Sequence, residues 1–210
     1  MPKAFTGSFA NSLDRVSELE IKEAEDGDMV ESGKALLAPG DAHMILKTNG
    51  SSYQAQLDTG ELVNRHRPAV DVLFRSVASI AGSAAVGVIL TGMGNDGAKG
   101  MTEMHDQGAL TLAQDQEACV VYGMPKVAVE SGAVDESLTP EQIVKRLIEW
   151  SWESSGFSAL FEIILFFKIL DVDFFLLAKQ RRIFLRSHFN LLITWLSNLW
   201  LILTYFEHVH

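Results

Sequence analysis

The chain has 210 residues, 48% of them hydrophobic, and a formal net charge of −10. A chain of this length can bury a sizeable core, and the negative charge argues against a nucleic-acid-binding protein, which normally presents a basic face. Cys119 is the single cysteine, so an internal disulfide is excluded. Because the first residues lack the apolar core of a signal peptide, we expect a cytoplasmic protein.

Composition changes near residue 150. All four tryptophans and nine of the twelve phenylalanines lie at or beyond this point. Residues 151–210 hold five acids and five bases, so residues 1–150, with 12 bases and 22 acids, carry the whole net charge. We therefore divide the chain into a body, residues 1–150, and an aromatic-rich apolar tail, residues 151–210, which the sequence leaves unassigned.

Helical and strand patterns alternate along the body. In chain order, they predict a helix over 5–19, an acidic and turn-prone stretch over 21–30, strands over 35–38, 43–47 and 53–57, a helix between Pro68 and Gly82, a strand over 86–90, a helix over 98–107, a strand over 109–113, and helices over 125–132 and 141–149. This order predicts an α/β fold with a doubly wound, mostly parallel sheet flanked by helices.

Local signals support three of these elements. Asn49-Gly50 predicts a β-hairpin that joins the strands over 44–47 and 53–57, inserted into the parallel fold. Thr139 to Gln142 reads as a capping box with proline at the first helical position. The first helix is predicted to bury one face, which consists of Phe5, Phe9, Leu13 and Val16.

The tail is predicted to be apolar and helical. Residues 157–178 include four charged side chains, which would be costly in lipid. Residues 189–206 form an 18-residue stretch without a formal charge, at the lower limit for crossing a bilayer, and three arginines precede it. Polar residues within this stretch argue against insertion. Membrane contact, which we do not favour, and an out-of-frame extension both stay open as explanations.

A glycine-rich corner follows the strand over 86–90. Gly92, Gly94 and Gly97 fall within six residues and lead into a helix, as at the site-forming corner of a parallel α/β sheet. The spacing matches G-x-G-x-x-G, and Asp115 follows the next strand, so a dinucleotide-binding module is one interpretation. Asp96 argues against it, because it places a negative charge where a pyrophosphate would bind.

Two other roles for Asp96 stay open. Its carboxylate could orient a catalytic histidine, with the backbone amides near Met93 and Gly94 as donors to an oxyanion. Alternatively, Asp96 could simply cap the helix that starts near Ala98. Spacing alone does not decide between these roles.

Four segments of the body together resemble the bacterial chemotaxis protein-glutamate methylesterases. In this chain they are Ala38–Asp41, Asn64–Asp71, Leu90–Gly97 and Cys119–Pro125, and the resemblance covers roughly residues 1–150. It implies a doubly wound catalytic domain that hydrolyses glutamate methyl esters, and deamidates glutamines, on chemoreceptors, with no cofactor or metal.

By this resemblance, Asp96 is the aspartate of a Ser-His-Asp triad, and the backbone amide of Met93 contributes to the oxyanion hole. Arg65, His66 and Arg67 could help dock the acidic receptor helix, although an exposed basic loop is an equal interpretation. The other body histidines, His43 and His105, are expected to be ordinary surface or edge residues.

The chain also departs from the family pattern. No Gly-x-Ser-x-Gly turn occurs in the 210 residues, and the family's histidine directly precedes a Met-Pro pair that is here Met1-Pro2. The family's regulatory receiver domain has no counterpart in the sequence. We therefore expect little or no esterase activity, and unpaired strand edges where central strands are missing. A non-catalytic chemoreceptor-binding remnant is an alternative.

Overall fold

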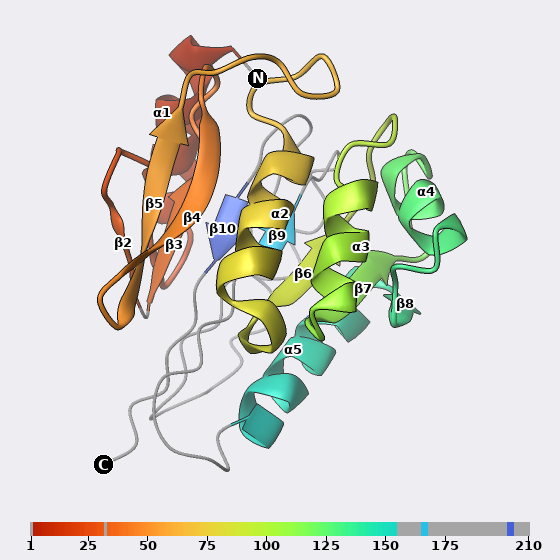
Figure 1. The fold of residues 1–210 in the computed structure, drawn as a ribbon. Helices are drawn as coiled ribbons and strands as arrows, with labels where there is room; N and C mark the ends of the chain where they lie inside the picture. Colours follow the sequence, from red (N-terminus) through yellow and green to blue (C-terminus); the bar gives the residue numbers. More distant parts are fainter. Residues whose placement is uncertain (1, 32, 155–164, 168–200, 204–210) are drawn as a thin grey trace.

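The computed structural model describes residues 2–31, 33–154, 165–167 and 201–203 of the chain (Figure 1). The elements are α1 (Lys3–Asp14), β1 (Glu20–Glu23), β2 (Met29–Val30), β3 (Lys34–Leu37), β4 (His43–Asn49), β5 (Ser52–Asp58), α2 (Val70–Ile80), a 3-10 turn η1 (Gly82–Ala84), β6 (Val86–Ile89), α3 (Ala98–Asp106), β7 (Leu110–Gln114), α4 (Met124–Glu130), β8 (Glu136–Leu138), α5 (Pro140–Ser154), β9 (Leu165–Phe167) and β10 (Leu201–Leu203).

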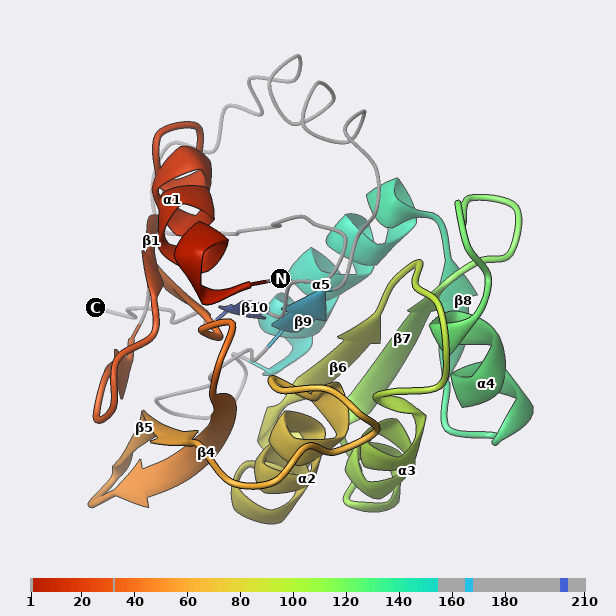
Figure 2. The same cartoon turned by 90° about the horizontal axis from the view of Figure 1, so that it is seen from above.

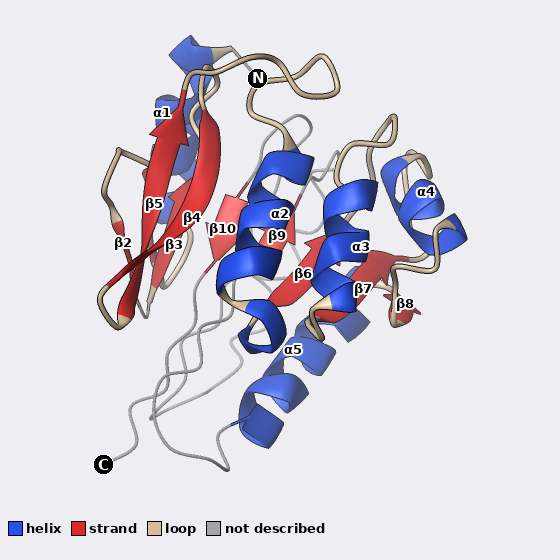
Figure 3. Ribbon diagram, viewed as in Figure 1, coloured by secondary structure: helices blue, strands red, loops and turns tan. Residues whose placement is uncertain are grey.

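Parallel strands with helices on both faces form the centre of the fold (Figure 3). Strand β7 lies between β6 and β8 and pairs with both in parallel, with Val86 opposite Leu110 and Leu112 opposite Glu136. Helices α2 and α3 cover one face of these strands, and α5 covers the other (Figure 2). β1 and β3 are also parallel. The prediction of a doubly wound, mostly parallel α/β fold is therefore confirmed.

The predicted hairpin is present. β4 and β5 pair antiparallel along their whole length, and β2 adds a third strand beside β5. The two-residue loop is Gly50-Ser51 rather than Asn49-Gly50, because Asn49 still pairs with Ser52 and Gly50 adopts a φ of 65°. The hairpin packs on α2, where the Ser76 hydroxyl accepts a hydrogen bond from the Leu46 amide at 2.8 Å.

Helix α1 buries a different face from the predicted one. Phe5 and Val16 are exposed, whereas the buried residues of the helix are Thr6, Ala10 and Leu13. Thr6 accounts for this rotation, because its hydroxyl hydrogen-bonds the Glu23 carboxylate and accepts the Gly40 amide at 3.3 Å. The polar contact between Thr6 and β1 therefore sets the orientation of α1, and the predicted apolar face is only partly buried.

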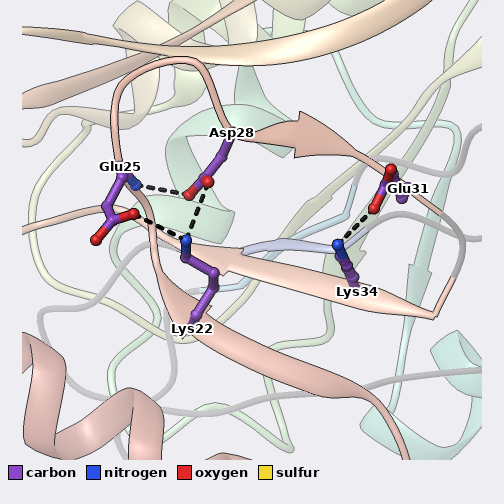
Figure 4. A network of polar contacts seen from close by, with 5 residues as sticks. All are labelled: Lys22, Glu25, Asp28, Glu31 and Lys34. Carbon is purple, nitrogen blue, oxygen red and sulfur yellow. Dashed lines mark hydrogen bonds and ion pairs between the residues drawn. The ribbon is translucent and has the colours of Figure 1, made fainter.

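The acidic stretch predicted as a turn contains two strands, β1 and β2. Lys22 lies between two carboxylates, 3.0 Å from Asp28 and 3.2 Å from Glu25, and Glu31 pairs with Lys34 nearby (Figure 4). The hydrogen bond with Asp28 is the main reason that the pKa of Lys22 is raised. These pairs offset the repulsion between neighbouring acids, which allows the stretch to adopt extended structure.

Close approach of α2 and α3 forms much of the core beneath the glycine-rich corner. A Cβ on Gly100 would lie 2.5 Å from the Cβ of Phe74, and a Cβ on Gly97 would lie 2.7 Å from Val70. Phe74, Met101 and Met104 are all fully buried in the cluster. The absence of side chains at the two glycines therefore fixes how closely α3 can lie against α2.

Helix α5 begins with the predicted capping box. The Thr139 amide donates to Gln142 Oε1 at 2.9 Å, and the Gln142 amide points back to the Thr139 hydroxyl at 3.4 Å. Ile143 and Leu147 of this helix are buried in the core. The helix continues to Ser154 and so crosses the change in composition near residue 150 without a break.

Most of the predicted helical tail lies outside the described residues. The described parts beyond α5 are two strands, β9 and β10, where the sequence predicts helix. In the part of the chain that the structure describes, no helix is both long and apolar enough to cross a membrane. The chain stretch over 189–206 is described only at 201–203.

Candidate active site

Three loops meet where β6 and β7 end. They are residues 59–69 before α2, residues 91–97 after β6, and residues 115–123 after β7. The last two are bound together by the Thr91 side chain, whose hydroxyl accepts the Val121 amide at 2.8 Å. The Thr91 amide in turn donates to Gln114 Oε1 at 2.8 Å. This is the carboxyl edge of a parallel sheet, where α/β proteins place their sites.

Asp96 lies at the centre of these loops and is only 3% exposed. Its carboxylate accepts hydrogen bonds from three donors, namely the Val70 amide at 3.0 Å, the Asp71 amide at 3.2 Å and the Asn64 side chain at 2.8 Å. Two of these donors are free amides in the first turn of α2. The positive end of the α2 dipole therefore stabilises the buried negative charge.

The cap interpretation of Asp96 is wrong in one respect. Its side chain makes no capping hydrogen bond to α3, whose N-cap is Gly97 at a φ of 91°. Instead, Asp96 caps the neighbouring helix α2, and Asp71 of α2 returns the interaction by accepting the Gly100 amide of α3 at 2.8 Å. Asp96, just before α3, thus caps α2, and Asp71 of α2 caps α3. Sequence spacing could not indicate this reciprocal capping.

Asn64 joins the two carboxylates. Its side-chain amide lies 2.7 Å from Asp71 Oδ2 and 2.8 Å from Asp96 Oδ1. The residue occupies a tight turn in which Asn64 and Arg65 have φ values of 51° and 64°. Val63 and His66 close this turn by reciprocal backbone hydrogen bonds. Positive φ at both central positions is typical of a type I′ turn, and asparagine tolerates this conformation well.

His43 holds the loop that carries Asn64. It is buried, in contrast to the prediction of a surface or edge residue. Its Nδ1 accepts the Ala69 amide at 3.1 Å, and its Nε2 lies 2.9 Å from the Glu61 carbonyl oxygen. Since a carbonyl only accepts, the imidazole is neutral with its proton on Nε2. His43 therefore fastens both ends of the loop and has no nitrogen left for catalysis.

The glycine-rich corner offers one hydrogen-bond acceptor, the Asp96 carboxylate, and one backbone donor, the Met93 amide. A carboxylate has about four lone-pair positions, of which Asp96 uses three, so one on Oδ2 stays available to an imidazole N–H. Met93 lies on the exposed part of the same loop, 79% accessible. Its amide N–H makes no hydrogen bond within the described residues. The structure thus brings Asp96 and Met93 into one loop beside an open surface.

The three basic residues of the 59–69 loop differ in their exposure and contacts. Arg65 and His66 are exposed at the tip of their turn, whereas the Arg67 guanidinium donates to the carbonyl oxygens of Thr59 and Gly60. Arg67 is thus used to hold its own loop. His105 lies at the opposite edge of the sheet, 3.4 Å from Asp135, where it lines a depression of about 400 Å³ with Arg146.

Cys119 lies beside the corner in the 115–123 loop. Burial, and then the charge of Asp115, raise the pKa of its thiol to about 11. The thiolate is the reactive form of cysteine, so this side chain is unsuited to act as a nucleophile at neutral pH. Within the described residues, no group of three His, Cys, Asp or Glu side chains could hold a metal ion.

Sequence reasoning missed four side chains that build this corner. Asn64, Asp71 and Thr91 lie within segments that carry the family resemblance, but the sequence indicates no role for them. Gln114 lies outside those segments. Their partners are 7 to 32 residues away along the chain, so the only available signal was the clustering of polar residues at the ends of strands and helices.

Comparison with known proteins agrees with this fold. The family described as CheB methylesterase matches residues 1–147. The chain belongs to the CheB methylesterase family. A crystal structure of the CheB methylesterase catalytic domain from Thermotoga maritima superposes with a TM-score of 0.69 at 45% sequence identity, and the match covers 71% of this chain and 79% of that one.

Curated relatives include the protein-glutamate methylesterases/protein-glutamine glutaminases 1 and 2 of Chromobacterium violaceum, 57% and 55% identical over 147 residues. A relative from Pectobacterium atrosepticum is 55% identical over 148 residues. These matches cover 70% of this chain. The chain spans about two-fifths of the length of these relatives, 41% for the first of them.

Proposed function

We propose that this chain contains part of the catalytic unit of a protein-glutamate methylesterase, in which Asp96 orients the catalytic base. Membership of the CheB methylesterase family supports the reaction class, which is hydrolysis of a carboxylic ester. The observation that carries the role of Asp96 is its buried carboxylate, fixed by three donors with one acceptor position unused. Such a carboxylate can hold an imidazole in one tautomer and stabilise its charged form.

Met93 is proposed to supply the oxyanion donor. Its exposed loop position leaves the amide N–H accessible to a reacting carbonyl oxygen. Gly123 packs directly behind it, since a Cβ there would lie 2.6 Å from the Gly92 carbonyl oxygen. This contact keeps the 91–97 loop in one conformation, and pre-organised donors are worth several kcal/mol in transition-state stabilisation.

The proposed substrate is a glutamate methyl ester, or a glutamine, of a protein, as the names of the relatives indicate. The resemblance of the four sequence segments implies that this protein is a chemoreceptor. Arg65 and His66 support docking of an acidic helix, because both are exposed beside the corner in an otherwise acidic body. Arg67 contributes by shaping this loop rather than by direct contact. A cytoplasmic location follows from the same proposal, since the methylated segments of chemoreceptors face the cytoplasm.

The dinucleotide interpretation receives less support. A pyrophosphate at the start of α3 would meet the Asp71 carboxylate, which already accepts the Gly100 amide there. Asp96 lies in the same turn. Two buried carboxylates beside the anion would oppose its binding by several kcal/mol. Titration with NAD should therefore leave the melting temperature unchanged, and a saturable increase would favour this alternative.

By itself the chain is proposed to be nearly inactive. It holds no Gly-x-Ser-x-Gly turn to supply a nucleophile, and loss of a triad serine or histidine costs up to about 10⁶-fold in turnover. Purified chain incubated with methylated chemoreceptor should release methanol at the background rate. Turnover similar to that of an intact relative would overturn this statement. Receptor binding without hydrolysis would indicate the non-catalytic remnant.

The role of Asp96 is best tested in a chimera. Residues 1–147 of this chain would replace the matching residues of the Chromobacterium violaceum relative, which is 57% identical. We expect methanol release by the chimera and a loss of about 10⁴-fold in kcat on Asp96→Asn, the size expected for a triad carboxylate. Asp106→Asn, at an exposed carboxylate of α3, is the matched control and should change kcat little.

A further inference from the structure

Two short strands from the tail extend the sheet that β1 and β3 begin. β10 pairs antiparallel with β3, with Ile202 opposite Leu36, and also pairs antiparallel with β9, with Ile202 opposite Phe166. β9 in turn lies alongside β6 (Figure 1). The hydrogen-bonded order is β1, β3, β10 and β9, and β9 contacts β6, which belongs to the sheet of β6, β7 and β8. The two tail strands therefore lie between β3 and β6.

The two flanking strands need partners at this position. β3 pairs with β1 along one edge, and β6 pairs with β7 along one edge. Their side chains are fully buried: Leu36 and Leu37 of β3 are at most 2% exposed, as are Val86 and Val88 of β6. Buried backbone N–H and C=O groups must be hydrogen-bonded. Open edges on such apolar strands would also promote association with other chains.

The direction of β10 indicates how the edge of β3 comes to be covered. The body strands β6, β7 and β8 run parallel because helices connect them, whereas β10 runs antiparallel to β3. A strand that arrives from a distant part of the chain is not held to the direction that helical crossovers impose. The two tail strands consist of apolar residues alone, Leu165–Phe167 and Leu201–Leu203, and such residues suit strands that are buried on both faces.

We infer that β9 and β10 act as an intramolecular insert between β3 and β6, with β10 paired to β3 and β9 packed beside β6. These two strands are then a structural part of the body that covers the neighbouring edges of β3 and β6. This role is independent of any esterase activity. It also places residues 165–167 and 201–203 among protein strands.

Disulfide trapping in the full chain tests this pairing directly. In a Cys119→Ser background, Leu36→Cys with Ile202→Cys places two cysteines opposite each other in the β3–β10 register. Mild oxidation should give an intramolecular disulfide, seen as a faster band on a non-reducing gel and as a linked peptide by mass spectrometry. The control Lys126→Cys with Ile202→Cys, on the exposed face of α4, should give none. Disulfide-linked dimers, or equal linkage in both variants, would overturn the inference.

A proline scan provides a second, independent measurement. Ile202→Pro removes a backbone donor from β10, whereas His208→Pro places the same residue outside the two strands. We expect Ile202→Pro alone to lose hydrogen-exchange protection in β3 and to melt at a lower temperature, or to be recovered only as aggregate while His208→Pro stays soluble. Equal protection and equal melting in the two variants would overturn the inference.

Discussion

At the scale of single residues, the site depends on two buried carboxylates, Asp71 and Asp96, that each accept several hydrogen bonds. Asp96 and Asp71 each accept amides of the other's helix, and Asn64 donates to both. Removing one partner would leave a buried carboxylate underpaired, which usually costs more than the net value of the lost hydrogen bond. Asn64 is therefore as important to the geometry of the corner as Asp96 itself.

The contribution of Asn64 can be measured by Asn64→Gly. Glycine keeps the positive φ of the turn but removes two hydrogen bonds to carboxylates, so we expect the free energy of unfolding to fall by about 2–4 kcal/mol. Urea denaturation provides the measurement. Arg65→Gly, at the other central position of the same turn, is the control and should change stability by about 0.5 kcal/mol or less. Equal losses in the free energy of unfolding would show that the conformation of the turn, and not the side-chain amide of Asn64, provides the stability.

Cys119 gives a prediction for pH dependence. Its pKa of about 11, against an ordinary 9.0, means that the folded state favours the neutral thiol. This contribution to stability is complete below pH 9 and is lost as pH rises from 9 toward 11. At pH 8 the folded chain should react with iodoacetamide about 100-fold more slowly than the same chain in denaturant. Equal rates at pH 8 would contradict the burial of this thiol.

At the scale of elements, the approach of α3 to α2 decides where Asp96 lies. The closest contact is at Gly100, whose own amide donates to Asp71, and the hydrogen bonds that Asp96 accepts from α2 lie about one helical turn away. Helix propensity alone would favour alanine over glycine at this position. The structure explains the glycine, because any side chain there would separate the helices and pull the two carboxylates away from their donors.

We therefore expect Gly100→Ala to destabilise the chain. Its Cβ would overlap Phe74 and the backbone of Asp71, and overpacking of this kind costs about 1–3 kcal/mol even after the gain in helix propensity. The control is Gly7→Ala in α1, where the nearest atom is the end of the flexible Glu23 side chain. That variant should be neutral or slightly more stable. Thermal unfolding of both variants supplies the comparison.

At the scale of the whole molecule, charge and strand order define what the chain can bind and how it holds together. The net charge of −10 lies entirely in the body, and the exposed basic residues Arg65 and His66 form one small island in it. Among the described residues, the tail strands β9 and β10 extend the sheet that β1 and β3 begin. Both properties involve residues that are far apart along the chain.

The charge leads to a prediction about nucleic acid. Binding to DNA depends on phosphate neutralisation by a basic face, so the chain should give no saturable change in fluorescence anisotropy with labelled duplex DNA at low salt. The control is a variant with lysines at several exposed acids, including Glu117 and Glu130, which should show weak binding that disappears as salt rises. Saturable binding by the unaltered chain would refute the prediction.

The sequence by itself determined the fold class, the hairpin, the capping box of α5 and the family, because these depend on local periodicity and short motifs. It also indicated Asp96 and Met93, which share one loop. Only the tertiary structure decided that Asp96 caps α2, that His43 is buried and binds the loop at Glu61 and Ala69, and that α1 exposes Phe5 to solvent. Each of these depends on a partner at least 17 residues away, as with Thr6 and Glu23. The glycine-rich corner could be read from its own residues, whereas the hydrogen bonds that hold its carboxylate come from elements that only folding brings together.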